Sequence, residues 1–283
     1  MTYNESARPL GDWGDPMTAN LRGALAYIRT FVGKVLIITE LEARKLRHDP
    51  ADLLTRAVQP VLWLLVFGEV LTQVKAIPTG NLSYLAFMTP GVLAQSVLFI
   101  SIFYGISIVW ERDLGIVQKF LVSPTPRTAI VAGKALSAGL RSLSQALIVF
   151  ILAFVLGVGI TGNPINILLV ILVVLLAAAI FATLSLIIAC MVKTRDRFMG
   201  IGQMITMPLF FASNAIYPIS LMPDWLKFIA YGNPLTYAVD ALRGLMITGG
   251  ASEYGILLDV CVLVFTAAAL MLIGGRLYAR VGR

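Results

Sequence analysis

Six apolar stretches alternate with more polar segments along this chain. Each is long enough to cross a bilayer, because about 20 apolar residues of helix span its hydrocarbon core. The expected spans cover residues 53–73, 84–110, 134–158, 165–192, 198–217 and 254–275. The pattern predicts an all-α membrane protein with six transmembrane helices. Composition agrees, since 58% of the 283 residues are hydrophobic and only 13% are charged.

Two segments precede the first span. Residues 1–20 are polar and contain Gly, Asp and Pro, so we expect a cytoplasmic tail without folded structure. This tail lacks a basic start that runs into an apolar core, and it does not look like a signal peptide. In residues 21–48 the apolar side chains recur at steps of three or four, which predicts an amphipathic helix on the inner membrane surface. A basic soluble helix that packs on a partner is the alternative.

Basic residues predict the orientation of the spans. We assign 19 of the 22 Lys and Arg residues to one side, including Lys134 and Arg141 at the start of the third span. The other side receives only Lys75, Lys227 and Arg243. The positive-inside rule then places both termini in the cytoplasm of a multi-pass protein of the cell membrane. Because topology accounts for the net charge of +7, we expect no nucleic-acid partner.

The composition of individual spans predicts how they pack. The fourth span is almost purely aliphatic, so we expect it to face lipid. The third begins with small residues that would let a neighbouring helix approach closely, namely Gly133, Ala135, Ser137, Ala138 and Gly139.

Between the fifth and sixth spans, prolines break residues 216–250 into short pieces. They predict two brief helices, at 224–231 and 234–246, with Asn233 as an N-cap and Pro234 at the first helical position. Asp240 and Arg243 lie three apart and can pair. We expect these helices to be re-entrant, dipping into the outer leaflet.

The hydrophilic segment from Glu111 to Leu121 predicts a short cytoplasmic helix at the membrane rim. Leu114, Val117 and Leu121 share one face, and the prolines at 124 and 126 end the helix. Taken alone, this is an ordinary amphipathic loop helix.

Its particular residues add a resemblance to a known family. The run Glu111-Arg-x-x-Gly-x-x-Gln-Lys-x-Leu-Val-Ser-Pro124 resembles the first cytoplasmic loop of ABC-2 type permeases, the membrane subunits of ABC exporters. Phe87-Met-Thr-Pro-Gly91 and Asn233-Pro-Leu-Thr-Tyr-Ala-Val-Asp-Ala-Leu-Arg243 are similar to two further motifs of that family. These motifs are most similar to those of the daunorubicin-resistance branch of the family. Gln118 stands where Glu is commoner, which weakens the case for a carboxylate contact there.

The resemblance implies an ATP-driven exporter that moves a hydrophobic or amphipathic compound, such as a drug, antibiotic or lipid-like molecule. Two copies, or this chain and a similar permease, would open a route between them by alternating access. A separate ABC ATP-binding subunit would hold ATP and Mg and contact the coupling residues, Glu111, Arg112, Asp113, Leu114, Gly115, Gln118, Lys119 and Leu121.

We expect no catalysis and no bound cofactor or metal on this chain. It has no phosphate loop, since the nearest fragment, Ala132-Gly-Lys-Ala135, lacks the first Gly and the hydroxyl. It also has no His-Glu-x-x-His motif, and its sequence contains a single histidine.

Aromatic, Met and polar residues of the second and fifth spans suit an adaptable substrate route, although plain packing is the alternative. These candidates are Gln95, Ser96, Phe99, Phe103, Tyr104, Met207, Phe210, Phe211 and Asn214. The candidate outer motif is Asn233, Pro234, Tyr237, Asp240 and Arg243.

Three other functions remain open at this point. One is an ABC exporter of polysaccharide or lipid-linked glycan. Another is an ion-coupled secondary transporter, which would need an ionisable residue near mid-membrane, and we expect none there. The third is a membrane enzyme acting on lipid through Asn233, Asp240 and Arg243.

Overall fold

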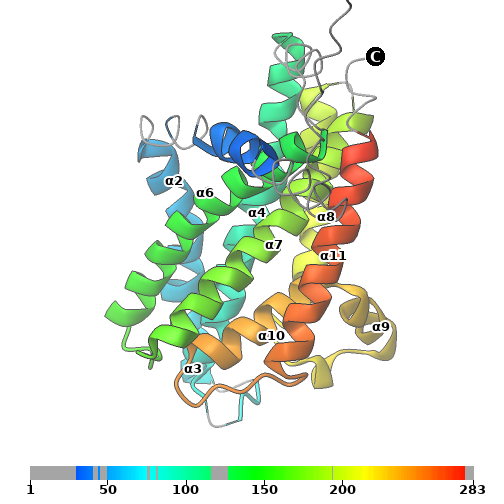
Figure 1. Ribbon diagram of the computed structural model, residues 1–283. Coiled ribbons are helices and arrows are strands. Elements are labelled where there is room, and N and C mark those ends of the chain that lie inside the picture. The colour runs from blue at the N-terminus through cyan, green and yellow to red at the C-terminus, as the bar shows by residue number, and fades with distance from the viewer. Residues whose placement is uncertain are drawn as a thin grey trace, which may run out of the picture.

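The computed structural model describes residues 30–40, 44, 50–74, 77–80, 82–115, 127–192 and 194–277 (Figure 1). In these residues the protein is helical and has no named strand. The expected tail at 1–20, and most of the expected coupling segment, lie outside them.

Five helical segments are long and apolar enough to cross a membrane: Thr55–Val74, Tyr84–Asp113, Thr128–Val155, Pro164–Met191 and Ile256–Leu277. The first is a rod made of α2 (Pro50–Leu62), the π-helix η1 (Trp63–Gly68) and α3 (Glu69–Val74). The others belong to α4 (Tyr84–Asp113), α6 (Arg127–Val155), α7 (Pro164–Met191) and α11 (Ile256–Leu277). The fold class is thus a multi-span helical protein.

The structure differs from the prediction at the expected fifth span, residues 198–217. In its place lies α8 (Arg195–Phe211), which has 17 residues and contains Pro208. The chain leaves the helix at Ala212 instead of continuing to residue 217. This helix is therefore shorter than the expected span. Among the described residues, five helical segments and not six are long and apolar enough to cross a membrane.

The expectation that the fourth span faces lipid is wrong for much of its length. α7 packs against α4, α6, α11 and the short helix α10 (Pro234–Met246), and its second half is largely buried. Lipid tails and a helix bundle are similarly apolar, so aliphatic composition alone cannot tell a buried membrane helix from an exposed one.

The two ends of the bundle are formed by different elements (Figure 1). At one, which we term the basic end, lie helix 30–40, the C-terminal ends of α4, α7 and α11, and the N-terminal ends of α6 and α8. Basic residues described there include Lys34, Arg112, Lys134, Arg195 and Arg276. The opposite end, termed the far end, carries α3, α9 (Asp224–Gly232) and α10.

Helix 30–40 crosses the start of α6 at the small residues noted in the sequence. Ile38 is buried there, and a side chain in place of Gly133 would meet its Cβ at 2.8 Å. The Thr39 hydroxyl also donates to the Gly133 carbonyl at 3.4 Å. Gly139 likewise lies against Leu175 of α7. The predicted close approach at these small residues is confirmed.

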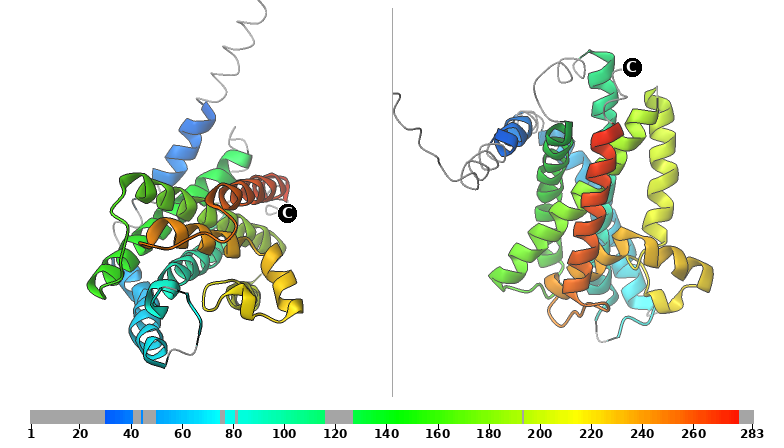
Figure 2. Two further views of the ribbon diagram at one scale, coloured as in Figure 1. Left: turned by 90° about the horizontal axis from the view of Figure 1, so that it is seen from below. Right: turned by 45° about the vertical axis from the view of Figure 1, so that its right-hand side comes forward.

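At the far end, the two short helices predicted from the prolines are present as α9 and α10. The Asn233 side chain caps α10 by accepting from the Leu235 N–H at 3.0 Å, and Pro234 occupies its first turn, as predicted. α10 packs on α4, α7 and α11 and crosses the middle of the molecule in the view from below (Figure 2, left).

Candidate coupling site and transport route

The last turn of α4 joins three other helices through three consecutive charged residues. The Glu111 carboxylate lies 2.6 Å from the Lys134 ammonium of α6. The Arg112 guanidinium donates to the Val192 carbonyl at the end of α7 at 2.8 Å. Asp113 pairs with Arg195 of α8 at 3.2 Å. Successive residues point about 100° apart around a helix, so one turn can reach three neighbours.

The Glu111–Lys134 pair is buried, with side-chain exposures of 9% and 3%. Two charges taken out of water need each other, because loss of one partner leaves an uncompensated buried charge. The pair therefore fixes the end of α4 to the start of α6, directly beside the contact of helix 30–40 with Gly133.

The start of α8 is held by a second contact with α4. The Arg195 guanidinium lies 3.4 Å from the ring centroid of Trp110, in cation–π geometry. Together with the Asp113 pair, this stacks the first residue of α8 on the last turns of α4.

α4 continues through Asp113, three residues past the expected end of the span, and stops at a glycine. Gly115 has φ of +70°, a left-handed conformation that other residues adopt at a cost. Leu114 just before it is 66% exposed. The coupling candidates thus differ in exposure, because Glu111 is buried whereas Leu114 faces outward. Gln118, Lys119 and Leu121 lie outside the described residues, and their contact with a partner stays a prediction.

A polar stripe continues from this turn into the bundle between α4 and α6. Two cations lie near the Tyr104 ring, with Lys134 Nζ 6.0 Å and the Arg141 guanidinium 5.6 Å from its centroid. One turn deeper, the hydroxyls of Ser101 and Ser142 lie 3.5 Å apart.

Arg141 corrects the expectation that no ionisable residue lies deep in a span. α6 begins at Arg127, seven residues before the expected start, so Arg141 falls at its middle. It lies eight residues beyond Gly133, or about 12 Å along the helix axis. The sequence pattern places Arg141 near the start of the expected span, because that span begins only at Lys134.

The expected route residues do not form one surface. On α4, Phe99 and Phe103 are partly exposed, whereas Gln95, Ser96 and Tyr104 are buried. A side chain at Gly202 of α8 would come within 3.6 Å of the Phe103 ring, which places these two helices side by side.

On α8 and the turn after it, burial also varies. Phe210 is buried, with its ring centroid 5.8 Å from that of Trp63 in η1. Phe211 is 46% exposed, Met207 is partly buried, and Asn214 is buried in the turn that follows. η1 itself was not expected from the sequence; π-helical turns occur often at functional sites.

Asn233 of the outer motif does more than cap α10. Its amide nitrogen donates to the carbonyls of Leu209 at 2.7 Å and Ala212 at 3.2 Å. The same side chain therefore starts one helix and binds the end of α8. Tyr237 OH donates to the Tyr231 carbonyl of α9 at 2.8 Å.

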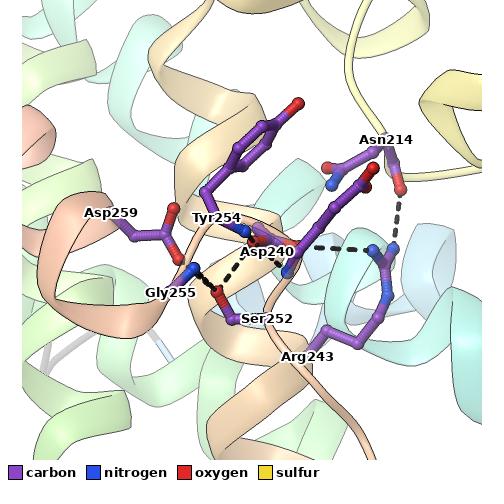
Figure 3. A network of polar contacts seen from close by, with 8 residues as sticks. Asn214, Asp240, Arg243, Ser252, Tyr254, Gly255 and Asp259 are labelled. Atoms are coloured by element: carbon purple, nitrogen blue, oxygen red, sulfur yellow. Dashed lines mark hydrogen bonds and ion pairs between the residues drawn. The ribbon is translucent and has the colours of Figure 1, made fainter.

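Asp240 holds the loop between α10 and α11 (Figure 3). One of its carboxylate oxygens, Oδ2, accepts from the Ser252 hydroxyl at 2.9 Å and from the N–H groups of Glu253 and Tyr254 at 2.8 and 3.1 Å. The same Ser252 oxygen also lies 2.9 Å from a carboxylate oxygen of Asp259 in α11, so the two carboxylates share its one proton. No sequence pattern indicates the contacts of Ser252, because its partners, 12 and 7 residues away, belong to two different helices.

Arg243 holds the turn after α8. Its guanidinium donates to the Asn214 carbonyl at 2.7 Å, lies 4.0 Å from the Phe87 ring centroid, and pairs with Asp240 at 3.9 Å, as the spacing predicted. Burial lowers the pKa of Arg243 to about 10, so the group stays protonated at neutral pH. The two charged residues of α10 thus connect the ends of α8, α4 and α11.

These features define a multi-pass membrane protein in which charged side chains connect the helices at both ends of the bundle. The chain belongs to the ABC-2 type transporter family, whose sequence profile matches residues 34–247. It is therefore an ABC transporter permease, a class that works with ABC ATP-binding subunits.

Relatives agree with this assignment. The chain is 29% identical to a protein of Cyanophora paradoxa named transport permease ycf38, over 76% of this chain and 74% of the relative. It is 28% identical to the daunorubicin resistance ABC transporter permease protein DrrB1 of Streptomyces coeruleorubidus, over 82% and 81%. It is 24% identical to the doxorubicin resistance permease DrrC of Mycobacterium tuberculosis, over 81% and 82%. Membership favours an ABC permease over an ion-coupled transporter or a lipid enzyme.

Proposed function

We propose that this chain is the membrane subunit of an ATP-driven exporter. Its basic end would face the cytoplasm, where a separate ABC ATP-binding subunit, carrying ATP and Mg, contacts the segment from Glu111 to Leu121. The excess of Lys and Arg at that end supports this orientation, because positively charged segments are retained inside.

The observation that carries the proposal is the set of three side-chain contacts at the end of α4. Glu111, Arg112 and Asp113 tie α4 to α6, α7 and α8 immediately before the coupling segment. A push on that segment would therefore move four helices as one group. Alternating access requires such rigid groups to move past each other. Glu111 would act by positioning α4, and exposed Leu114 would contact the partner.

We further propose that α8 is the sixth membrane helix. Its 17 residues extend about 26 Å, close to the roughly 30 Å of a hydrocarbon core. Two copies would meet with η1, α4 and α8 around the route, and α9 and α10 would dip into the outer leaflet. Exposed Phe211 and Met204 and partly exposed Phe103 would then face the partner copy or the cargo.

For the cargo, we propose a hydrophobic or amphipathic compound of the drug or antibiotic kind. The support is the names of two relatives, which refer to daunorubicin and doxorubicin resistance, together with the aromatic and Met side chains of α4 and α8.

The proposal is tested by reconstituting the permease with its ATP-binding subunit in vesicles and following ATP-dependent movement of daunorubicin. We expect transport only with both subunits and ATP. Leu114→Arg should lower copurification of the ATPase and transport by about tenfold or more, because it places a charge at the centre of an apolar contact. Leu221→Arg, an exposed leucine at the far end, is the control and should transport normally. Transport by the permease alone would refute the proposal.

A further inference from the structure

Of the three helices joined to the last turn of α4, α8 depends on that turn the most. α6 and α7 pack against α4 more extensively than α8 does, and they also pack against each other. Among the described residues, α8 packs mainly on α4 and only weakly on α7. α6 and α7 would therefore follow a movement of α4 even without their charged contacts, whereas α8 needs a specific one.

Arg195, the first residue of α8, makes that contact. Its guanidinium lies 3.4 Å from the ring centroid of Trp110 and 3.2 Å from a carboxylate oxygen of Asp113, both in the last turns of α4. The stack fixes the plane of the guanidinium, and the charge pair fixes its direction within that plane. Arg112 of the same turn donates to the Val192 carbonyl at 2.8 Å. The link between α7 and α8 is thus held on both sides by the end of α4.

Other contacts would keep α8 in place if Arg195 were lost. One turn further along, Phe198 is fully buried against α4, where a side chain at Gly105 would meet its ring at 2.6 Å. Apolar packing is non-directional, so this contact holds α8 on α4 without fixing its inclination. The far end of α8 is bound separately, by Asn233 of α10. Arg195 is therefore the directional contact at the basic end of α8.

We propose that Arg195 is a positioning residue for transport, through which a movement of α4 reaches α8. The inference rests on the proposed function, in which an ATP-binding subunit pushes the segment after α4 and α8 borders the route. Trp110 and Asp113 would move with that segment, and Arg195 would draw the start of α8 along. Without Arg195, α4 would move and α8 would lag behind, so ATP would be hydrolysed with little cargo moved.

The test uses the complete complex of the permease with its ATP-binding subunit in vesicles. Daunorubicin transport and ATP hydrolysis are measured together, and their ratio is compared between the wild type, Arg195→Gln and Arg195→Lys. Gln removes the charge and the stacked guanidinium, whereas the Lys ammonium can still pair with Asp113 and lie over Trp110. A purely structural loss would lower transport and hydrolysis together and leave their ratio unchanged.

We expect Arg195→Gln to lower the daunorubicin moved per ATP by about fivefold, the size of one cation–π contact together with one exposed ion pair. Arg195→Lys should retain most of the ratio. Trp110→Leu should repeat the loss from the α4 side, which keeps the test decisive if Arg195→Gln does not fold. Arg197→Gln, the same change at an exposed arginine two residues further along α8, is the matched control and should keep the wild-type ratio.

A thiol on α8 reports the movement of that helix directly. Met204 is 68% exposed, so Met204→Cys is introduced together with Cys190→Ala and Cys261→Ala. Its rate of modification by N-ethylmaleimide is compared without nucleotide and with ATP plus vanadate. We expect the rate to change in this background and with added Arg197→Gln, but not with added Arg195→Gln. If the background neither transports nor shows the change, the proposed function fails and this inference with it. If Arg195→Gln keeps both the ratio and the change of rate, this inference alone is overturned.

Discussion

At the scale of single residues, several charged side chains of this protein connect separate elements at the ends of the bundle. Glu111, Arg112 and Asp113 each bind a different helix, and at the far end Asp240 binds the loop before α11 and Arg243 binds the turn after α8. The sequence indicated that Asp240 and Arg243 can pair, because they lie one turn apart on one helix. It could not indicate the Glu111–Lys134 pair, since no local rule links residues 23 positions apart.

A prediction at this scale concerns the buried pair of α4 and α6. Lys134→Met should destabilise the protein by about 3–5 kcal/mol, because it leaves the Glu111 carboxylate buried without its cation. The double variant Glu111→Gln, Lys134→Met removes both charges and should recover most of that loss. Thermal unfolding of the detergent-solubilised protein measures both. If the double variant is no more stable than Lys134→Met, the loss of stability does not come from an unpaired Glu111 carboxylate.

At the scale of elements, the sequence predicted which helices form better than where they pack. The prolines and Asn233 predicted α9 and α10 to within one residue. Hydropathy could not predict the burial of α7, since an aliphatic helix suits lipid and protein alike. Nor could it predict η1, because a π-helical turn has no periodic signature, or the early start of α6, where Lys134 and Arg141 obscured the apolar run.

The packing of α4 on the turn after α8 gives the prediction at this scale. A Cβ at Gly91 would collide with the backbone of Ala215, whereas Gly200 in α8 has nothing within 4 Å of the same position. Gly91→Ala should therefore cost about 1–3 kcal/mol of stability through overpacking. Gly200→Ala should be neutral or stabilise by up to about 1 kcal/mol, because alanine favours a helix. Thermal unfolding of the two variants compares one chemical change in two environments, and equal shifts would contradict the close contact.

At the scale of the whole molecule, sequence motifs were enough to identify the family. The contacts between helices, in contrast, required the structure. Three short motifs led to the ABC-2 type family, which the profile over residues 34–247 confirms. The contacts of Asp240, however, exist only where the loop before α11 meets α10. Side chains such as Ser252 and Asp259 have no distinguishing pattern in the sequence, and only the fold brings them to one place.

The proposed meeting of two copies through α8 gives the prediction at this scale. α8 contacts α4 and, more weakly, α7, and leaves Met204 68% exposed, while Phe265 of α11 is 77% exposed on a different helix. If two copies meet through α8, a cysteine at 204 lies near its symmetry mate, whereas one at 265 faces lipid. With Cys190 and Cys261 replaced by Ala, Met204→Cys should therefore form disulfide-linked dimers under mild oxidation in membranes, and Phe265→Cys should not. A disulfide needs Cα atoms within about 7 Å, so the reaction reports direct contact. Dimers from Phe265→Cys in place of Met204→Cys would move the interface to α11 and remove α8 from the proposed route.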